Sequence, residues 1–260
     1  MTACRRVIFN ADDFGLTDGV CRGIREAASA GIVTATTAMV CTEGARDRLV
    51  EWGRSPSLAG RIGVHLQLTQ GHACLPPAEI PSIVDPAGTF PESPADVVNV
   101  DPGHVRDEWS AQIAKLRSWG VEPSHMDSHH HIGLRPYMVE AYVATAVSSR
   151  LPARTNSPAL TATLRARGAR CVDLSVTSWY DGKLSAKRLL RVVEAAFERI
   201  SGEGTIEVMC HPGFADERLA AKSNYVRQRE FELDVLTSDR LVNGLRKLDV
   251  EVGSMTSLAA

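Results

Sequence analysis

The chain has 260 residues, of which 44% are hydrophobic and 23% are charged, and its formal net charge at pH 7 is −2. This length and composition predict one globular domain over residues 1–260. The near-neutral charge, without a long basic run, argues against nucleic acid or an anionic membrane as a partner. No apolar run is long enough to cross a bilayer, and the first residues lack a signal-peptide core, so we predict a cytoplasmic protein with no membrane span.

Short apolar runs alternate with amphipathic segments along the chain. Besides a histidine-rich strand after residue 124, we predict strands at residues 5–10, 33–41, 61–69, 152–155, 170–174, 205–211 and 249–253. We predict helices at residues 17–32, 43–53, 103–119, 136–149, 185–200, 223–236 and 238–247. Thr17 or Asp18 is expected to cap the first helix. Repeated strand–helix units indicate a parallel sheet, either a (β/α) barrel or a doubly wound sheet.

Residues 71–103 interrupt this alternation, because they are rich in proline and glycine and show little periodicity. We expect a long surface loop here, and loops of this length in a compact domain are usually functional or disordered. The loop is therefore a candidate for shaping the choice of substrate.

The stretch SHMDSHHHIGLRP, residues 124–136, contains four of the eight histidines. In an extended chain the side chains alternate between two faces, so His125, Asp127, His129 and His131 would share one face. Three imidazoles and a carboxylate are costly to bury together unless a metal ion satisfies them. A surface turn is the alternative interpretation.

Polar groups end several of the predicted strands, in the motifs NADDFG, VHLQLT, HMDSHHH and MCHPGF. Functional sites form at this edge of parallel α/β sheets. Together the motifs supply carboxylates and imidazoles for a three-ligand divalent metal site with an adjacent acid and base. Asp12 and Asp13 are neighbours that face opposite ways on an extended chain, so one can bind metal while the other hydrogen-bonds water. His211 is a candidate for the acid that protonates a leaving group.

The segments NADDFGLTDGVCRGIREAASAGIVTATTAMV, GVHLQLT, SHMDSHHHI and EVMCHPGF resemble, in this order, the YdjC family of carbohydrate deacetylases. That family includes the chitooligosaccharide deacetylases and the hopanoid-biosynthesis-associated HpnK proteins. The resemblance implies an α/β fold, a single-domain distorted (β/α) barrel related to the polysaccharide deacetylases. It also implies metal-dependent removal of an N-acetyl group from an acetylated amino sugar, such as a chitooligosaccharide or glycolipid, with release of acetate.

Carried over position by position, the resemblance implies Asp13, His65 and His129 as the metal ligands. It implies Asp12 as the general base and His211 as the general acid. One divalent metal ion is expected. Magnesium is associated with the family by resemblance, whereas two imidazoles and a carboxylate suit zinc, cobalt or manganese.

Further residues are candidates for supporting roles. Asp127 is expected to orient a histidine or to lie near the metal, and His131 to lie near the site. Aromatic rings stack on sugar faces, so the candidates for a sugar platform are Trp179, Tyr180 and Tyr225, with core packing as the alternative. Gly133 replaces a further histidine of some relatives, which bears on the pocket wall and the substrate.

Other functions stay open at this point. A metallohydrolase of this fold that cleaves a phosphoester or a cyclic amide is one alternative, and a non-catalytic sugar-binding relative is another. Lys222 and Arg229 lie in a charged helical segment that is usually a solvated face, although either residue is a candidate for a place near the substrate. A homodimer is the commonest closed assembly and is a further possibility.

Overall fold

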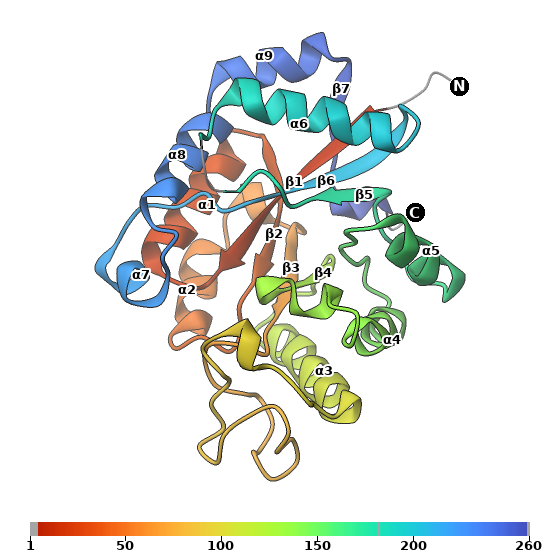
Figure 1. Ribbon diagram of the computed structural model, residues 1–260. Coiled ribbons are helices and arrows are strands. Elements are labelled where there is room, and N and C mark those ends of the chain that lie inside the picture. Colours follow the sequence, from red (N-terminus) through yellow and green to blue (C-terminus); the bar gives the residue numbers. More distant parts are fainter. Residues whose placement is uncertain (1–4, 181–182, 259–260) are drawn as a thin grey trace.

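The structure is a computed structural model that describes residues 5–180 and 183–258. The described strands form one parallel sheet in the order β4-β3-β2-β1-β6-β5, with β7 also paired to β1 (Figure 1). The strands are β1 (Arg5–Phe14), β2 (Val33–Ala38), β3 (Ile62–Leu66), β4 (Met126–Ser128), β5 (Leu174–Val176), β6 (Gly204–Cys210) and β7 (Val250–Val252).

Helices connect the strands and lie around the outside of the sheet (Figure 1). They are α1 (Asp18–Ser29), α2 (Ala45–Trp52), α3 (Pro102–Ser118), α4 (Val139–Ser149), α5 (Pro158–Ala166), α6 (Ala186–Arg199), α7 (Glu217–Lys222), α8 (Arg227–Leu236) and α9 (Asp239–Lys247). The predicted cap of α1 is confirmed, because the Thr17 side chain accepts a hydrogen bond from the backbone N–H of Val20. Two short helices, α5 and α7, go beyond the predicted elements, and each begins after a capping side chain, Ser157 or Asp216.

The sheet forms the distorted barrel that the resemblance implied, because Ala153 links Met126 of β4 to Cys171, just before β5, and so joins the two ends of the strand order. The long strand β1 pairs with three neighbours. One edge of β1 pairs with β6. The other edge pairs with β7 at residues 5–7 and with β2 at residues 9–14. A strand of ten residues is long enough to be shared in this way.

The wall between β4 and β5 is closed only by isolated bridges. Ala153 bridges to Met126 on one side and to Cys171 on the other. The strand predicted at 152–155 is therefore reduced to bridges at Ala153, and the strand predicted at 170–174 to a bridge at Cys171 and to Leu174, the first residue of β5. We call this narrow part of the wall the seam.

Alternation along β1 places polar groups inside the barrel. Val7, Phe9 and Ala11 pack in the main core cluster, whereas Ile8 belongs to a separate small apolar cluster. Asn10 shares the face of Ile8, because side chains alternate with period two. The inward face of β1 thus changes from apolar to polar as the strand approaches its carboxyl end.

Residues 71–101 of the loop predicted at 71–103 form a long connection, which runs in orange and yellow between β3 and α3, and the last two predicted residues already begin α3 (Figure 1). We call it the cavity loop. Its first residues pair antiparallel with residues near Thr89, through the bridge between His72 and Thr89. Among the described helices, none combines the length and the apolar character that crossing a membrane requires.

Candidate active site

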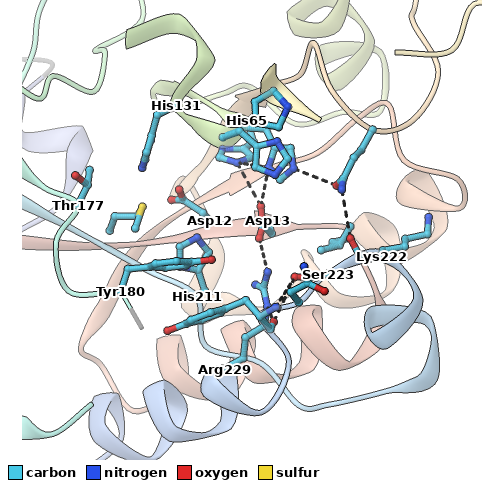
Figure 2. Close-up of a pocket in the computed structure, with 18 of the residues that line it drawn as sticks. Asp12, Asp13, His65, His131, Thr177, Tyr180, His211, Lys222, Ser223 and Arg229 are labelled. Atoms are coloured by element: carbon cyan, nitrogen blue, oxygen red, sulfur yellow. Dashed lines mark hydrogen bonds and ion pairs between the residues drawn. The ribbon is translucent and has the colours of Figure 1, made fainter. Parts of the chain in front are cut away.

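A cavity of about 520 Å³ opens at the carboxyl ends of the strands (Figure 2). The carboxylates of Asp12 and Asp13 line it together with the imidazoles of His65, His129 and His211. All five residues are buried. The convergence of the polar strand ends that the sequence predicted is therefore present in the structure.

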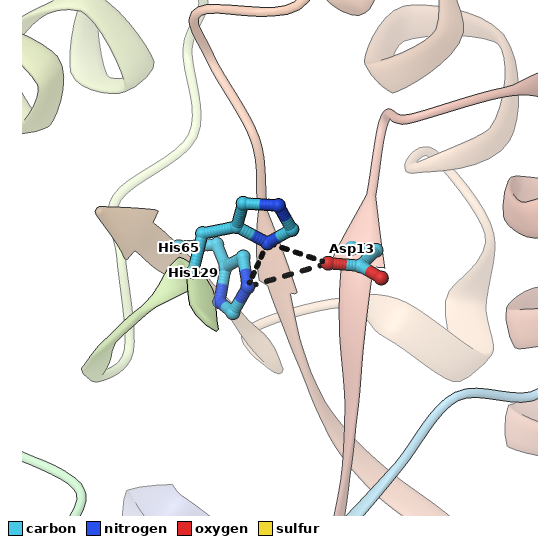
Figure 3. Close-up of side chains that lie close together, drawn as sticks. All are labelled: Asp13, His65 and His129. Atoms are coloured by element: carbon cyan, nitrogen blue, oxygen red, sulfur yellow. Dashed lines mark hydrogen bonds and ion pairs between the residues drawn. The ribbon is translucent and has the colours of Figure 1, made fainter. Parts of the chain in front are cut away.

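Three of these residues form a triangle of donor atoms, which we call the donor triangle (Figure 3). Asp13 Oδ1 lies 3.3 Å from His65 Nε2 and 3.2 Å from His129 Nδ1, and the two nitrogens are 3.2 Å apart. Asp13 Oδ1 is buried and has no well-aligned hydrogen-bond donor among the described residues. A single cation about 2.0–2.2 Å from each atom fits such spacings.

Outer partners fix which atoms of the donor triangle face its centre. Asp127 Oδ1 lies 2.6 Å from His65 Nδ1, so that nitrogen carries the proton and Nε2 presents its lone pair. Arg229 Nη2 holds the other oxygen of Asp13, Oδ2, at 2.7 Å, and Figure 2 shows Asp13 between His65 and Arg229. The expected role of Asp127 as an orienting residue agrees with this contact.

Gln70 does the same for His129. Its Oε1 lies 3.2 Å from His129 Nε2, while its Nε2 donates to the backbone carbonyl of Lys222 at 3.3 Å. Because the amide nitrogen is engaged by a carbonyl, the amide oxygen faces the imidazole and accepts its N–H. His129 Nδ1 therefore carries a free lone pair. All three atoms of the donor triangle are hydrogen-bond acceptors, and each has a lone pair for a metal ion.

Acceptors this close repel one another unless a positive charge lies between them. The neighbouring carboxylates raise the pKa of His65 to about 10 against the opposing effect of burial, with Asp127 the largest contributor. In the absence of a metal, a proton on His65 supplies the positive charge. The chemistry of the donor set thus fits a divalent cation.

Asp12 and Asp13 diverge, as expected for neighbours. Asp13 has a left-handed backbone conformation (φ 70°), and the pairing of β1 with β2 is irregular between Ala11 and Phe14. Asp12 meets Arg154, whose Nη1 and Nη2 each lie 2.7 Å from one of its oxygens. Burial alone would raise the pKa of Asp12, but the charge and hydrogen bonds of Arg154 outweigh it and hold that pKa well below its usual range.

Arg154 also joins two further buried carboxylates, Glu207 Oε1 at 2.7 Å and Asp127 Oδ2 at 2.9 Å. The sequence analysis did not single out Arg154 or Glu207. The available signal was a lone acid within the apolar strand TIEVMC, since a buried charge needs a partner.

His211 follows β6 and faces the cavity across from the donor triangle. Burial lowers its pKa to about 4, so the imidazole is neutral near pH 7. Its Nδ1 lies 3.9 Å from Glu232 Oε1, and its backbone N–H donates to the other oxygen of Glu232. Burial raises the pKa of Glu232 to about 7, against hydrogen bonds from His211 and from the hydroxyl of Tyr225.

The charged segment around α8 is not simply a solvated face, which corrects that interpretation. Arg229 and Glu232 are buried and support the site, whereas Arg227 is exposed. Buried ion pairing with Asp13 and hydrogen bonding with His211 explain why these two charges point inward. Lys222 is exposed and lines the cavity.

The histidine-rich stretch departs from simple alternation. Strand β4 ends at Ser128, and His130 and His131 both have left-handed backbone conformations. His131 still lines the cavity, but through this turn and not through strand geometry. His125 lies outside the cavity lining and contacts Asn10 Oδ1 at 2.7 Å instead.

The aromatic candidates separate into two groups. Trp179 is fully buried and does not line the cavity, which corrects its place in the sugar platform and matches the alternative of core packing. Tyr180 and Tyr225 do line the cavity, with their rings stacked at a centroid distance of 4.3 Å. Tyr180 is 45% exposed and forms the accessible face of the stack.

Comparison with known proteins places these features in a family. Residues 6–247 match the family described as YdjC-like protein. The chain is 36% identical to the carbohydrate deacetylase of Geobacillus stearothermophilus over 95% of this chain and 96% of that protein. It is 33% identical to the carbohydrate deacetylase of Enterococcus faecalis over 98% of both chains.

One solved structure is also similar over nearly the whole length. It is the crystal structure of an Enterococcus faecalis protein described as a candidate for cellobiose-phosphate cleavage, with a TM-score of 0.87, 32% sequence identity and coverage of 98% of this chain and 99% of that chain. The match to the family description, the full-length relatives and the shared fold agree. The chain belongs to the YdjC-like family of proteins.

Proposed function

We propose that this protein is a metal-dependent carbohydrate N-deacetylase, which hydrolyses the acetamide of an acetylated amino sugar and releases acetate. The observation that carries the proposal is one cavity with the donor triangle, a separate carboxylate on Asp12 and a separate imidazole on His211. Full-length relatives described as carbohydrate deacetylases support the same reaction.

Asp13, His65 and His129 would hold the metal ion. When bound, the ion polarises the acetyl carbonyl and lowers the pKa of a water molecule. A set of two imidazoles and one carboxylate favours zinc, cobalt or manganese over magnesium, and magnesium stays a candidate through the family resemblance.

Asp12 is the general base in this proposal. Its pair with Arg154 keeps the carboxylate ionised at neutral pH and fixes both oxygens in place. A fixed carboxylate orients the attacking water and accepts its proton as the carbon–oxygen bond forms. The low pKa limits its strength as a base, so positioning is the larger part of its contribution.

His211 is the general acid that protonates the departing amine. It is neutral in the resting site, so it must gain a proton before it can give one. Glu232 is the buried acid beside it, with a pKa of about 7 and an oxygen 3.9 Å from Nδ1. We infer that the protonated Glu232 carboxyl transfers its proton to His211 Nδ1, which makes the imidazole cationic, and that the other ring nitrogen then gives a proton to the amine.

The substrate is an acetylated amino sugar whose ring stacks on Tyr180. An exposed tyrosine face beside His211 suits the apolar face of a sugar, and the two rings lie 5.4 Å apart. The cavity volume falls within the range of small-molecule sites. Glu92 and Pro94 of the cavity loop form another part of the wall and contribute to the choice among chitooligosaccharides, glycolipids and smaller sugars.

The alternative functions have weaker support. A binuclear phosphoesterase would need a second cation site, and the only other group near enough is Asp12, His65 and Asp127 among the described residues. Arg154 already forms ion pairs with both carboxylates of that group, which leaves less negative charge for a second cation. A purely sugar-binding protein would require neither Asp12 nor His211 in the cavity.

The test is acetate release from N,N′-diacetylchitobiose and from an N-acetylglucosaminyl lipid. The protein is stripped with EDTA and then supplied with magnesium, zinc, cobalt or manganese, and phosphate release from a phosphorylated sugar serves as the comparison. We expect acetate only when a metal is present. Phosphate without acetate, or no product from a stoichiometrically loaded protein, would reject the proposal.

A further inference from the structure

Two cysteine thiols face each other outside the candidate active site. Cys41 follows β2, and Cys74 lies in the cavity loop, yet their sulfur atoms are only 3.8 Å apart. Neither residue lines the cavity. The sulfurs therefore form a separate cluster at the base of the cavity loop, together with the carboxylate of Glu108.

Backbone hydrogen bonds hold both cysteines in place. The N–H of Cys41 donates to the Gln67 side chain, and its carbonyl accepts from the N–H of His72. The N–H of Cys74 donates to both oxygens of Glu108 at 2.9 and 3.1 Å. The facing thiols are thus a built feature of the fold.

Glu108 is already satisfied, which disfavours a metal ion here. Besides the Cys74 N–H, its carboxylate accepts from the N–H of Leu75 at 3.0 Å and from the side chain of Gln112 at 2.8 Å. Few lone pairs are left for a cation, and two thiols alone are a poor structural site. The remaining chemistry for two close thiols is oxidation.

We propose that Cys41 and Cys74 are an oxidation site that a peroxide converts into a disulfide. The thiolate of Cys74 attacks one peroxide oxygen, the O–O bond breaks, and the leaving hydroxide is protonated to water. The sulfur of Cys41 then attacks the sulfenic acid on Cys74, the S–O bond breaks, and the Cys41 proton leaves with that oxygen as a second water. Two thiols are oxidised and one peroxide is reduced to two waters.

The two cysteines suit different steps. Cys74 is partly exposed and so meets the oxidant first, whereas Cys41 is buried. Burial, together with nearby Cys74 and Glu108, raises the pKa of Cys41 well above its usual range, which protects it from direct attack by oxidants.

The disulfide would fix one arm of the cavity loop against the end of β2. That arm pairs with residues near Phe90, through hydrogen bonds of Phe90 N–H to Gly71 and of Ala73 N–H to Gly88. The paired arm continues directly to Glu92 and Pro94, which line the cavity. Oxidation therefore acts on the substrate wall formed by these two residues.

The experiment oxidises the intact protein with stoichiometric hydrogen peroxide and counts free thiols after denaturation. We expect the loss of two thiols, a Cys41–Cys74 cross-linked peptide lighter by two hydrogens, and full recovery with dithiothreitol. The Cys74→Ser variant should lose no thiol pair, and Cys41→Ser is the second test variant. Cys171→Ser is the matched control, because this buried cysteine lies neither in the cavity loop nor in the segment after β2, and it should behave like wild type.

Two results would overturn the inference. One is an unchanged thiol loss in Cys74→Ser, and the other is oxidation of Cys74 to a sulfinic acid without a cross-link. The oxidised protein should also melt about 5 °C higher, because the cross-link restricts the unfolded chain. These readouts do not depend on the proposed deacetylase activity. If that activity holds, oxidation should change KM more than kcat, by about twofold or more, and equal changes would remove the assigned effect on the wall.

Discussion

Arg154 and Asp12 form a buried ion pair in which both terminal guanidinium nitrogens, Nη1 and Nη2, and both carboxylate oxygens take part, at 2.7 Å each. The pair fixes a carboxylate that would otherwise rotate, at the point where the cavity meets the barrel interior. It also places a positive charge between three buried acids, since Asp127 and Glu207 contact the same guanidinium. Stability, and catalysis in the proposed reaction, therefore depend on the same side chain.

Removal of the positive charge of Arg154 should lower the stability of the folded protein. Arg154→Met leaves three carboxylates buried without their partner, and we expect the free energy of unfolding to fall by about 3–5 kcal/mol. Urea unfolding of the metal-free protein measures it. Arg165→Met is the control, because the Arg165–Asp173 pair is partly exposed, with Arg165 52% accessible, and should cost at most about 1 kcal/mol. Similar losses in the two variants would contradict the assigned role.

Substitutions of Asp12 and Asp13 should have different effects, one on activity and the other on metal content. Asp12→Asn retains the donor triangle, so we expect normal metal content with kcat for acetate release reduced about 10²- to 10⁴-fold. Asp13→Asn removes a ligand, so metal content itself should fall. Elemental analysis beside the acetate assay distinguishes the two outcomes. Full activity of Asp12→Asn would show that another group is the base.

Gln70 should control metal affinity without touching the metal. Gln70→Leu leaves His129 Nε2 without its acceptor, and we expect metal affinity to fall about 10- to 100-fold. Gln70→Glu keeps an oxygen at that position and should bind metal more nearly like wild type. Competition with a chromogenic chelator gives both affinities. If the two variants bind equally, the hydrogen bond does not orient the imidazole.

Glu232 should make stability depend on pH. Its pKa is raised in the folded state, from 4.5 to about 7, so the fold favours the protonated carboxyl. That contribution is complete below about pH 4.5 and is lost as pH rises through 7. The stability of wild type relative to Glu232→Gln should therefore decrease between pH 5 and pH 8, by up to about 3 kcal/mol. Guanidinium unfolding across this range measures the difference, and a flat or rising difference would refute the raised pKa.

From the strand ends alone, the sequence predicted that carboxylates and imidazoles would meet at one sheet edge, and the family resemblance implied which three of them form the donor triangle. The sequence also offers Asp127 as an orienting residue and Arg229 as a candidate near the substrate, and these two hold His65 and Asp13, but it does not single out the other supporting residues. Gln70, Arg154 and Glu232 come from separate segments without a motif, and only folding brings them beside the site. The placement of His131 also failed as an alternation argument, because the backbone turns left-handed after His129 and the period of two ends there.

The seam is the part of the barrel wall with the fewest bridges between strands, so the backbone there is expected to open more easily than elsewhere in the sheet. Between β4 and β5 the wall relies on a few backbone hydrogen bonds, such as Met126 N–H to the Pro152 carbonyl and Ala153 N–H to Arg170. Arg154 follows directly, and its guanidinium reaches carboxylates on β1, β4 and β6. Backbone amides at the seam would ordinarily exchange with solvent early. Here a local opening must also separate Arg154 from its buried carboxylates, so these ion pairs hold the two sides of the seam together. Slow hydrogen exchange at the Ala153 amide therefore reports that the ion pairs of the site are intact.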